Sequence, residues 1–102
     1  TQEHNTPTDQ FRLGYAYAQS DSHDLAVEVL NKITDASPDV AQSAWYQLGQ
    51  SYLVLAKNTE ARQAFGQASK IDFSLPLKEQ AWAAYAQLSV DLGNPTEEFR
   101  LI

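Results

Sequence analysis

Apolar residues recur every three or four positions in four stretches of the chain, which is the spacing of amphipathic α-helices. These stretches are residues 11–18, 26–33, 45–55 and 61–71. Short polar or proline-containing breaks separate and follow them, at residues 20–22, 35–38, 57–59 and 72–76. No stretch alternates apolar and polar residues long enough to indicate a β-strand. The pattern therefore predicts an all-α fold of helices joined by short turns.

Local signals predict where individual helices begin and end. Ser37 is expected to cap the third helix, with Pro38 in the first turn of that helix. Asn58 or Thr59 is expected to cap the fourth helix. Gly93 is expected to end a fifth helix, after which residues 94–102 would form a short sixth.

The chain repeats itself at a nearly constant interval. The triplet Leu13, Gly14, Tyr17 recurs 35 residues later as the triplet Leu48, Gly49, Tyr52. Ala26 recurs at the same interval as Ala61, and Trp45 recurs as Trp82 after 37 residues in a degenerate third copy. Self-similarity at such an interval is the sequence signature of stacked structural repeats. Each copy is expected to contain two helices.

The recurring glycine needs a physical reason, because glycine inside a helix costs about 1 kcal/mol relative to alanine. Gly14 precedes Ala26 by 12 residues, and Gly49 precedes Ala61 by the same distance. We expect each of these pairs to meet where the two helices of a copy cross. Large side chains are expected to pack around the crossings as core residues: Trp45, Leu48, Tyr52, Phe65 and Trp82.

These residues together resemble the tetratricopeptide repeat family, whose pattern begins W-x2-L-G-x2-Y. The second copy carries the fullest match, with Trp45, Leu48, Gly49, Tyr52, Ala61, Phe65 and Ala68. Residues 1–102 are interpreted as one domain, with repeats at 7–40 and 42–75 and a degenerate or truncated third repeat at 79–102. The resemblance implies antiparallel helix-turn-helix repeats that stack into a right-handed superhelical solenoid. Residues 72–94 also resemble repeats of bacterial cell-envelope proteins, which favours the periplasm or envelope over the cytoplasm.

Composition narrows the classes of partner. The formal net charge is −6, and the seven Lys and Arg residues are scattered. Nucleic acids and anionic membrane surfaces are bound by clustered cations, so neither is expected as a partner. No apolar run approaches the roughly 20 residues of a membrane-spanning helix, so no direct membrane insertion is expected. The absence of cysteine excludes disulfides and thiol chemistry.

Two short motifs have residue types found in reactive sites. His23 lies between Asp21 and Asp24, but no second pair of metal ligands has matching spacing, so these residues are interpreted as the start of the second helix. Ser51 follows Gly49 as in a nucleophile elbow, without the strand and the second glycine that such an elbow needs. No catalytic residue, metal or cofactor is therefore expected, and the protein is interpreted as a non-enzyme.

In tetratricopeptide arrays the first helix of each repeat lines a concave groove. The resemblance assigns eight partner-binding positions to that groove: Phe11, Tyr15, Tyr46, Gln50, Leu53, Gln80, Gln87 and Val90. This face is uncharged, its aromatic rings supply contact area, and its glutamine amides can pair with a peptide backbone. The expected function is a scaffold for protein–protein interaction that binds a peptide or a helix of a partner.

Two alternatives to groove binding stay open. The aromatic residues of this face could pack only among themselves, as aromatic stripes at helical spacing usually do. The chain could also be an assembly module, in which Trp82 and Tyr85 at the C-terminal end pair with another copy or with further repeats.

Overall fold

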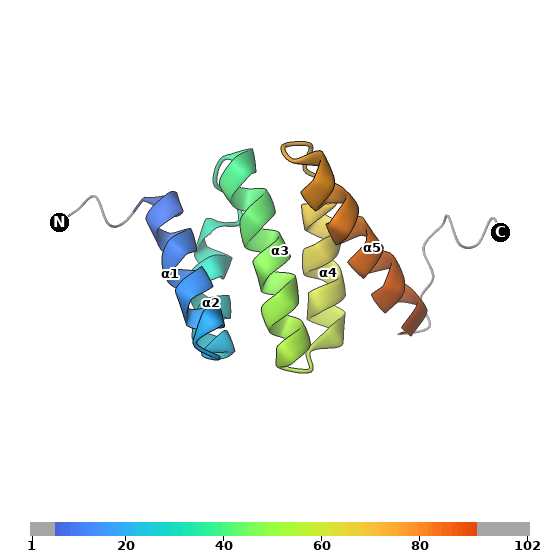
Figure 1. Cartoon of the computed structure of the whole chain (residues 1–102), viewed down its shortest axis with the longest axis horizontal. Coiled ribbons are helices and arrows are strands. Elements are labelled where there is room, and N and C mark those ends of the chain that lie inside the picture. Colours follow the sequence, from blue (N-terminus) through green and yellow to red (C-terminus); the bar gives the residue numbers. More distant parts are fainter. Residues whose placement is uncertain (1–5, 92–102) are drawn as a thin grey trace.

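The computed structural model describes residues 6–91, which form five α-helices and one short 3-10 helix. The elements are α1 (Pro7–Gln19), α2 (His23–Leu30), η2 (Asn31–Ile33), α3 (Pro38–Val54), α4 (Asn58–Ala68) and α5 (Leu75–Asp91). Successive helices run antiparallel, and residues 6–91 contain no strand (Figure 1). The all-α prediction is confirmed. Gly93 and the predicted sixth helix lie outside the described residues.

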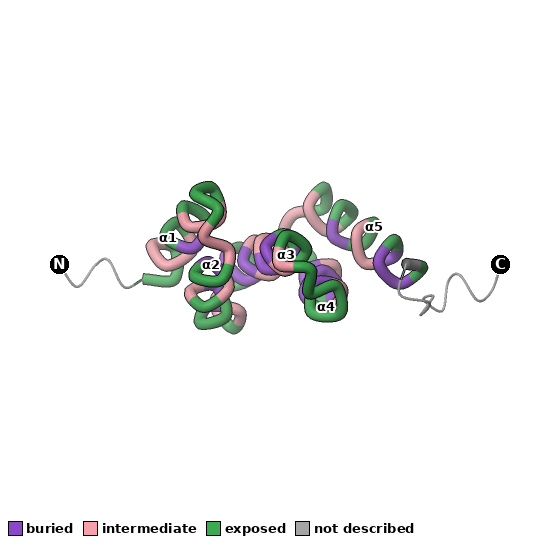
Figure 2. Tube along the Cα trace, turned by 90° about the horizontal axis from the view of Figure 1, so that it is seen from below, coloured by how far each residue is buried: buried purple, intermediate pink, exposed green. Residues whose placement is uncertain are grey.

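The helices form two layers. Helices α1, α3 and α5 lie in front, and α2 and α4 lie behind them (Figure 1). Seen from below, α1 and α5 stand higher than α3 (Figure 2). Side chains of these three front helices line a common cavity, and we call the face that they form the trough. The predicted stack of helical hairpins is therefore present. The right-handed superhelical path and the outer bounds of the three predicted repeats stay predictions.

The core lies between the two layers, where the buried faces of the helices meet (Figure 2). Leu30 and Leu48 are fully buried at the centre of one cluster, and Phe65 is fully buried at the centre of a second. Burying one such side chain contributes about 1.5–3 kcal/mol to folding. Trp45 and Tyr52 are half-buried and pack against the first cluster, so their predicted core role is confirmed.

Trp82 departs from the prediction that it is a core residue. Its side chain is 42% exposed. In the second repeat, Trp45 is half-buried and packs against the first cluster, which includes Ala64 of α4, the second helix of the same repeat. The positions where a sixth helix was expected for the third repeat, residues 94–102, lie outside the described residues. Trp82 thus presents an aromatic surface at the C-terminal end of the described stack.

The two repeated glycines sit at close helix approaches, but their neighbours differ from the expected alanines. A Cβ atom at Gly14 would lie 2.7 Å from side-chain atoms of Leu30, and a Cβ atom at Gly49 would lie 2.7 Å from the Phe65 ring. Leu30 and Phe65 follow Ala26 and Ala61 by one helical turn. The side chains nearest to the two glycines therefore lie one turn beyond the alanines, and the expected meeting of each glycine with its alanine stays a prediction.

Both hairpin turns have the same conformation. Asp21 and Ala56 each adopt a φ of 62°, in the left-handed region, directly after the helix. The next residue donates its backbone N–H back into the helix, from Ser22 to Tyr17 O and from Lys57 to Tyr52 O, both at 2.8 Å. This is the Schellman motif, which satisfies carbonyl groups at a helix end.

The second helix of each hairpin begins at once after this motif. Ser22 is the N-cap of α2, and Lys57 is the N-cap of α4. The prediction that Asn58 or Thr59 caps α4 was therefore wrong, because the Schellman turn leaves no further residue before the helix. His23 begins α2, as expected.

The start of α3 agrees with the sequence signals. Ser37 is the N-cap and Pro38 lies in the first turn. The Ser37 hydroxyl donates to the Asp39 carboxylate at 2.5 Å instead of accepting from a backbone N–H. This hydrogen bond and the Val40 backbone N–H lower the pKa of Asp39 below its ordinary value.

The connection between α4 and α5 is held by one buried side chain. Helix α4 ends at Ala68, and the chain from Ala68 to Trp82 is two residues longer than the matching chain from Ile33 to Trp45. Gln42 of α3 is fully buried beneath this connection. Its amide group donates to Ile71 O at 2.8 Å and to Ser74 O at 3.1 Å, and it accepts from Ser74 N at 3.0 Å.

Helix α5 starts directly after this held connection. The Ser74 hydroxyl accepts a hydrogen bond from the Leu77 backbone N–H at 3.4 Å, and Ser74 O accepts from the Lys78 N–H. Pro76, which was expected within a break, lies in the first turn of α5, where its missing N–H costs nothing. Gln42 therefore holds the connection directly before the first helix of the third repeat.

Candidate functional site

A cavity of about 320 Å³ lies on the trough side of the molecule, between the front helices. Helix α1 contributes Phe11 and Tyr15, α3 contributes Ser43, Tyr46 and Gln47, and α5 contributes Leu77. Three of the eight predicted partner-binding residues, Phe11, Tyr15 and Tyr46, therefore lie around one cavity. Residues of three helices that are far apart in the sequence meet there because the front helices are stacked side by side (Figure 1).

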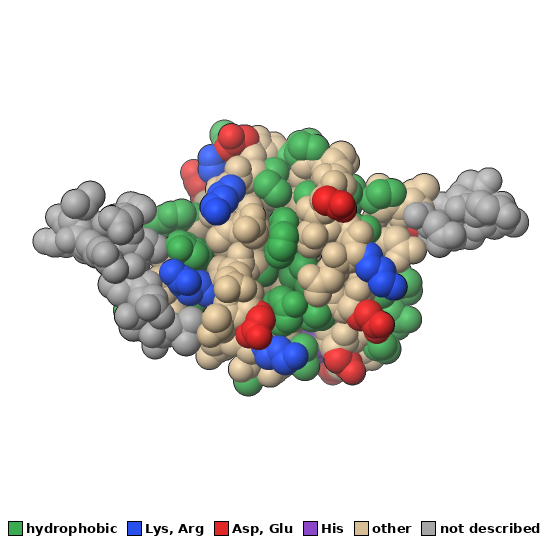
Figure 3. All heavy atoms as spheres, turned by 180° about the vertical axis from the view of Figure 1, so that it is seen from behind, with side chains coloured by type: hydrophobic (Ala, Val, Ile, Leu, Met, Phe, Trp, Pro, Cys, Tyr) green, Lys and Arg blue, Asp and Glu red, His purple; other side chains and the backbone are tan. Residues whose placement is uncertain are grey.

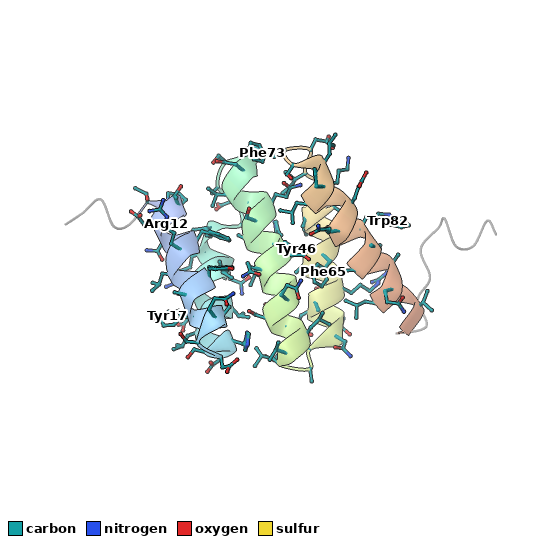
Figure 4. The ribbon with its side chains drawn as sticks, viewed as in Figure 1. Arg12, Tyr17, Tyr46, Phe65, Phe73 and Trp82 are labelled. Carbon is teal, nitrogen blue, oxygen red and sulfur yellow. The ribbon has the colours of Figure 1, made fainter. Side chains whose placement is uncertain are left out.

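The three aromatic rings of the cavity have defined positions. The rings of Phe11 and Tyr15 stack, with their centroids 6.1 Å apart and an angle of 27° between their planes. The Tyr46 ring packs edge-on against the buried ring of Phe65, with centroids 5.4 Å apart and an angle of 67° (Figure 4). Tyr46 therefore packs on the core through Phe65, and this contact restricts the position of its ring.

The rings pack together and still face solvent. Tyr15 is 46% exposed, and Phe11 and Tyr46 are half-buried. The open alternative, in which these aromatics only pack among themselves, explains the Phe11–Tyr15 contact but not the exposed area of Tyr15. Exposed aromatic side chains grouped in a concavity are typical of binding surfaces.

The cavity carries no formal charge. None of its six lining residues is an acid, a lysine, an arginine or a histidine. Arg12, next to Phe11 in the sequence, forms an ion pair with Asp9 at 3.9 Å, and its side chain is largely exposed. The lining offers apolar ring surface together with hydroxyl and amide groups that can donate or accept hydrogen bonds.

Five predicted binding residues do not line this cavity. Gln50 and Leu53 lie on exposed positions further along α3, and three exposed residues lie on α5: Gln80, Gln87 and Val90. Gln47 and Leu77 line the cavity and were not predicted. Gln47 follows Ser43 by one helical turn, a spacing that places both on one face of a helix. Leu77 was not predicted because it lies between the predicted break at residues 72–76 and the predicted third repeat at residues 79–102.

A larger cavity, of about 650 Å³, opens on the opposite side of the molecule. It lies between the connection before α3 and the end of α4, and its apolar lining includes Trp45, Ile71 and Phe73. A neighbouring cavity shares Trp45 and Gln67 with it. Apolar side chains run down the middle of this rear face (Figure 3). Trp45 lines both rear cavities and also packs against the core, and none of the predicted binding residues lines either rear cavity.

The two short motifs with residue types found in reactive sites meet in the structure, because His23 of α2 contacts Ser51 of α3. His23 Nδ1 lies 3.2 Å from Ser51 Oγ, and His23 Nε2 lies 3.7 Å from an Asp21 carboxylate oxygen. Ser51 is fully buried, so a substrate cannot reach its hydroxyl. Among residues 6–91, no three histidine or acidic side chains come together as a metal site. The contact joins the start of α2 to the last turn of α3.

Between the second and third repeats, the Arg62 side chain occupies a position that an uncharged residue occupies between the first two repeats. Ser89 stands where Tyr52 stands in the second repeat, and Arg62 stands where Val27 stands in the first. The Arg62 guanidinium lies 4.8 Å from the centre of the Tyr85 ring, and its Nε donates to Ser89 Oγ at 2.8 Å. Arg62 therefore fills the space that the smaller Ser89 leaves.

Comparison with known families agrees with this architecture. A family model described as the tetratricopeptide repeat matches residues 10–40 and 42–74, which is more than half of the chain. No curated protein and no solved structure matches the chain. Over residues 6–91, no helix combines the length and the apolar character that crossing a membrane requires. Repeats of the matched family generally mediate protein–protein interaction and are typically non-catalytic. The chain belongs to the tetratricopeptide repeat family.

Proposed function

We propose that this chain is a non-catalytic interaction domain that holds a segment of a partner protein in the trough formed by α1, α3 and α5. The observation that carries the proposal is the uncharged aromatic cavity in that trough, where Phe11, Tyr15 and Tyr46 meet. Tyrosine and phenylalanine supply large contact areas while few rotatable bonds become fixed, so they often dominate binding energy.

The proposed contact surface extends beyond the cavity. Gln50 and Leu53 continue it along α3, and three residues continue it along α5: Gln80, Gln87 and Val90. These side chains are exposed, so a partner can reach them. Glutamine amides both donate and accept hydrogen bonds, which suits them to contact a peptide backbone.

A capture experiment with soluble extract of the source organism tests this function. The wild type would be compared with the variant Tyr15→Ala/Tyr46→Ala/Gln50→Ala, after circular dichroism has established that the variant is still helical. We expect a partner that the wild type retains and the variant loses. Phe73→Ala, which removes an exposed aromatic ring outside the trough, is the matched control and should retain the partner. Equal capture by the wild type and the triple variant would refute the proposal.

A second candidate function is assembly through the C-terminal end. It is favoured by the exposure of Trp82, at 42%, and of Leu75, at 62%. Trp82 lies beside two shallow cavities, of about 310 and 330 Å³, along α4 and α5. Under this alternative, another copy or further repeats would cover the Trp82 side chain. Mass measured by light scattering should then rise with protein concentration, and Trp82→Ala should abolish the rise.

The proposed location is the bacterial periplasm or cell envelope, on the resemblance of residues 72–94 to envelope repeats. Fractionation of source cells, with detection of the native protein by antibody, tests it. Recovery with cytoplasmic markers would contradict this location without bearing on the binding surface.

A further inference from the structure

We infer that the ligand class of the trough cavity is an uncharged, proline-rich segment in the polyproline II conformation. This inference rests on the proposed function and names the chemistry of the partner segment. Three features of the cavity support it: the helical backbone around it, the absence of charge, and the arrangement of its aromatic rings and polar groups.

The backbone of the cavity walls is already hydrogen-bonded. All six lining residues lie within α1, α3 or α5, where backbone groups pair within the helix, except that the Leu77 N–H in the first turn of α5 donates to the Ser74 hydroxyl. The walls therefore offer no strand edge to which a β-strand of a partner could add. Ligand carbonyl groups must be met by side chains, and Ser43, Gln47 and the tyrosine hydroxyls are the donors around this cavity.

A polyproline II segment suits side-chain donors of this kind. Its carbonyl groups point outward and have no internal hydrogen bonds, and its proline residues have no N–H group that would need an acceptor. A helical ligand would instead present carbonyls that are already used within the helix. The hydroxyl and amide groups of Tyr46 and Gln47 would then lose water without gaining partners, which is unfavourable.

The absence of charge excludes a ligand that depends on charged side chains at this position. An acidic or basic group placed between Tyr15, Tyr46 and Leu77 would lose hydration and meet no opposite charge. Pyrrolidine rings carry no charge and have flat apolar faces. Pro-rich segments dock on aromatic-lined grooves for this reason, and their stiffness lowers the entropy lost on binding.

The ring geometry provides the apolar seat. Phe11 and Tyr15 form a stacked pair on α1, and Tyr46 faces the same cavity from α3. Phe65 fixes Tyr46 from the core side, so this wall is preformed. A preformed aromatic seat loses less entropy on binding than one that must first order its side chains.

Fluorescence anisotropy with a labelled synthetic peptide of repeating Pro-Pro-Gln tests the inference. We expect saturable binding to the wild-type chain, and a loss of affinity of about 10-fold or more when every proline of the peptide is replaced by alanine. Tyr15→Ala should weaken binding by about 10-fold or more, because this exposed ring contacts the ligand and not the core. Phe73→Ala, the control outside the trough, should bind as the wild type does.

Tyr46→Phe separates the ring from its hydroxyl group and keeps the packing on Phe65. We expect it to weaken binding several-fold if the hydroxyl donates to a ligand carbonyl. Equal binding of the proline and alanine peptides, no binding at millimolar peptide, or equal affinity of Tyr15→Ala and wild type would each overturn the inference. Binding of a neutral chito-oligosaccharide in place of the peptide, lost in Tyr15→Ala, would also overturn it in favour of a glycan ligand.

The capture experiment distinguishes failure of this inference from failure of the proposed function. A partner that depends on Tyr15, Tyr46 and Gln50, together with no binding of the proline peptide, would leave the function standing and reject the ligand class. Absence of both results would reject both.

Discussion

Two glycines set how closely the paired helices approach. Side-chain atoms of Leu30 and Phe65 occupy the space beside Gly14 and Gly49 that any other residue would need for its Cβ atom. The crossing therefore combines the largest fully buried residue of the described core, Phe65, with the smallest possible residue opposite it.

We predict that Gly49→Ala destabilises the protein by about 1 kcal/mol. Overpacking a core costs about 1–3 kcal/mol, and the higher helix propensity of alanine recovers about 1 kcal/mol of that. Gly66→Ala is the matched control and should cost less stability, because its Cβ atom would lie 3.0 Å from the half-buried Tyr85 ring, compared with 2.7 Å from the fully buried Phe65 ring at Gly49. Chemical denaturation measures both variants. A Gly49→Ala protein as stable as the wild type would show that the crossing is looser than described.

A single hydroxyl group affects the titration of Asp39. The hydrogen bond from Ser37 is the largest cause of its lowered pKa. We predict that Ser37→Ala raises the pKa of Asp39 toward the ordinary value and that Ser37→Thr, which keeps a hydroxyl, leaves it low. NMR titration of the Asp39 carboxyl carbon measures the change.

The sign of the effect on stability follows from the lowered pKa. The hydrogen bond stabilises the folded protein above the pKa that Asp39 has in the unfolded chain. This contribution is lost as the pH falls through the lower folded pKa. In Ser37→Ala the contribution of the Ser37 hydroxyl is absent while that of the Val40 N–H remains. The variant should therefore be less stable than wild type at neutral pH, and the two stabilities should converge in acid. Parallel stability profiles down to the lowest pH would contradict this account.

At the scale of elements, the hairpin turn is the part that repeats most faithfully in conformation. Asp21 and Ala56 occupy the same left-handed position 35 residues apart, although neither is glycine. Left-handed backbone costs a residue with a Cβ atom roughly 1 kcal/mol. The Schellman hydrogen bonds and the packing of the two helices offset that cost.

We predict that Ala56→Gly stabilises the protein by about 0.5–1 kcal/mol. Ala56 is exposed, so little packing is lost, and glycine adopts the left-handed conformation without steric cost. The greater freedom of glycine in the unfolded chain reduces the gain. Ala83→Gly, in the exposed middle of α5, is the control and should destabilise by about 1 kcal/mol. Thermal unfolding separates the two, and a lower Tm for Ala56→Gly would contradict the strain described.

Most elements could be predicted from the spacing of apolar residues, while their junctions could not. The repeated Leu-Gly-Tyr pattern located the helices and their pairing. The N-cap of α4 was missed because Lys57 is not a capping residue by type and is placed there by the turn before it. The end of α4 was placed too late because Ile71 continues the apolar pattern, although its carbonyl is bound by Gln42.

The third repeat looked degenerate for a reason that the structure explains. Ser89 is too small for the position of Tyr52, and Arg62 extends across Tyr85 to meet it. The third repeat thus has a smaller residue at the position of Tyr52, and the neighbouring helix α4 has a longer residue at the position of Val27. A single sequence shows both changes but cannot show that the two side chains touch.

At the scale of the whole molecule, Gln42 couples the second repeat to the third. It is fully buried and makes three hydrogen bonds to the connection before α5. It was not singled out in the sequence because a lone glutamine in a helix is ordinarily a surface residue.

We predict that Gln42→Leu destabilises the protein by about 2–4 kcal/mol. The substitution leaves the half-buried Ser74 N–H and Ile71 carbonyl without their side-chain partner, while Ser74 O keeps its hydrogen bond from the Lys78 N–H. Gln50→Ala, at an exposed position of the same helix, should change stability by less than about 0.5 kcal/mol. Hydrogen exchange should show lost protection concentrated in α5, and uniform loss over all helices would contradict the local coupling.

The residues of the candidate cavity could be predicted only in part, because the place of one of them depends on contacts of polar side chains that leave no periodic pattern. Phe11, Tyr15 and Tyr46 were found because the repeat pattern assigns helix faces. Leu77 was missed because its place in the cavity depends on where α5 begins, and that depends on Gln42 and Ser74. A contact set by a buried amide leaves no periodic signal in the sequence.

The two Schellman turns lie along one edge of the molecule, and neither can be lengthened without moving the helix that follows it. Ser22 and Lys57 each end one motif and begin the next helix, so an inserted residue would rotate the following helix by about 100° and expose its buried face. On the opposite edge, Gln42 pins the connection at residues 69–74. Among the connections within residues 6–91, that leaves the exposed Asp35 as the place where an inserted loop or tag can be accommodated, since Ala36 packs against the core and Ser37 caps α3.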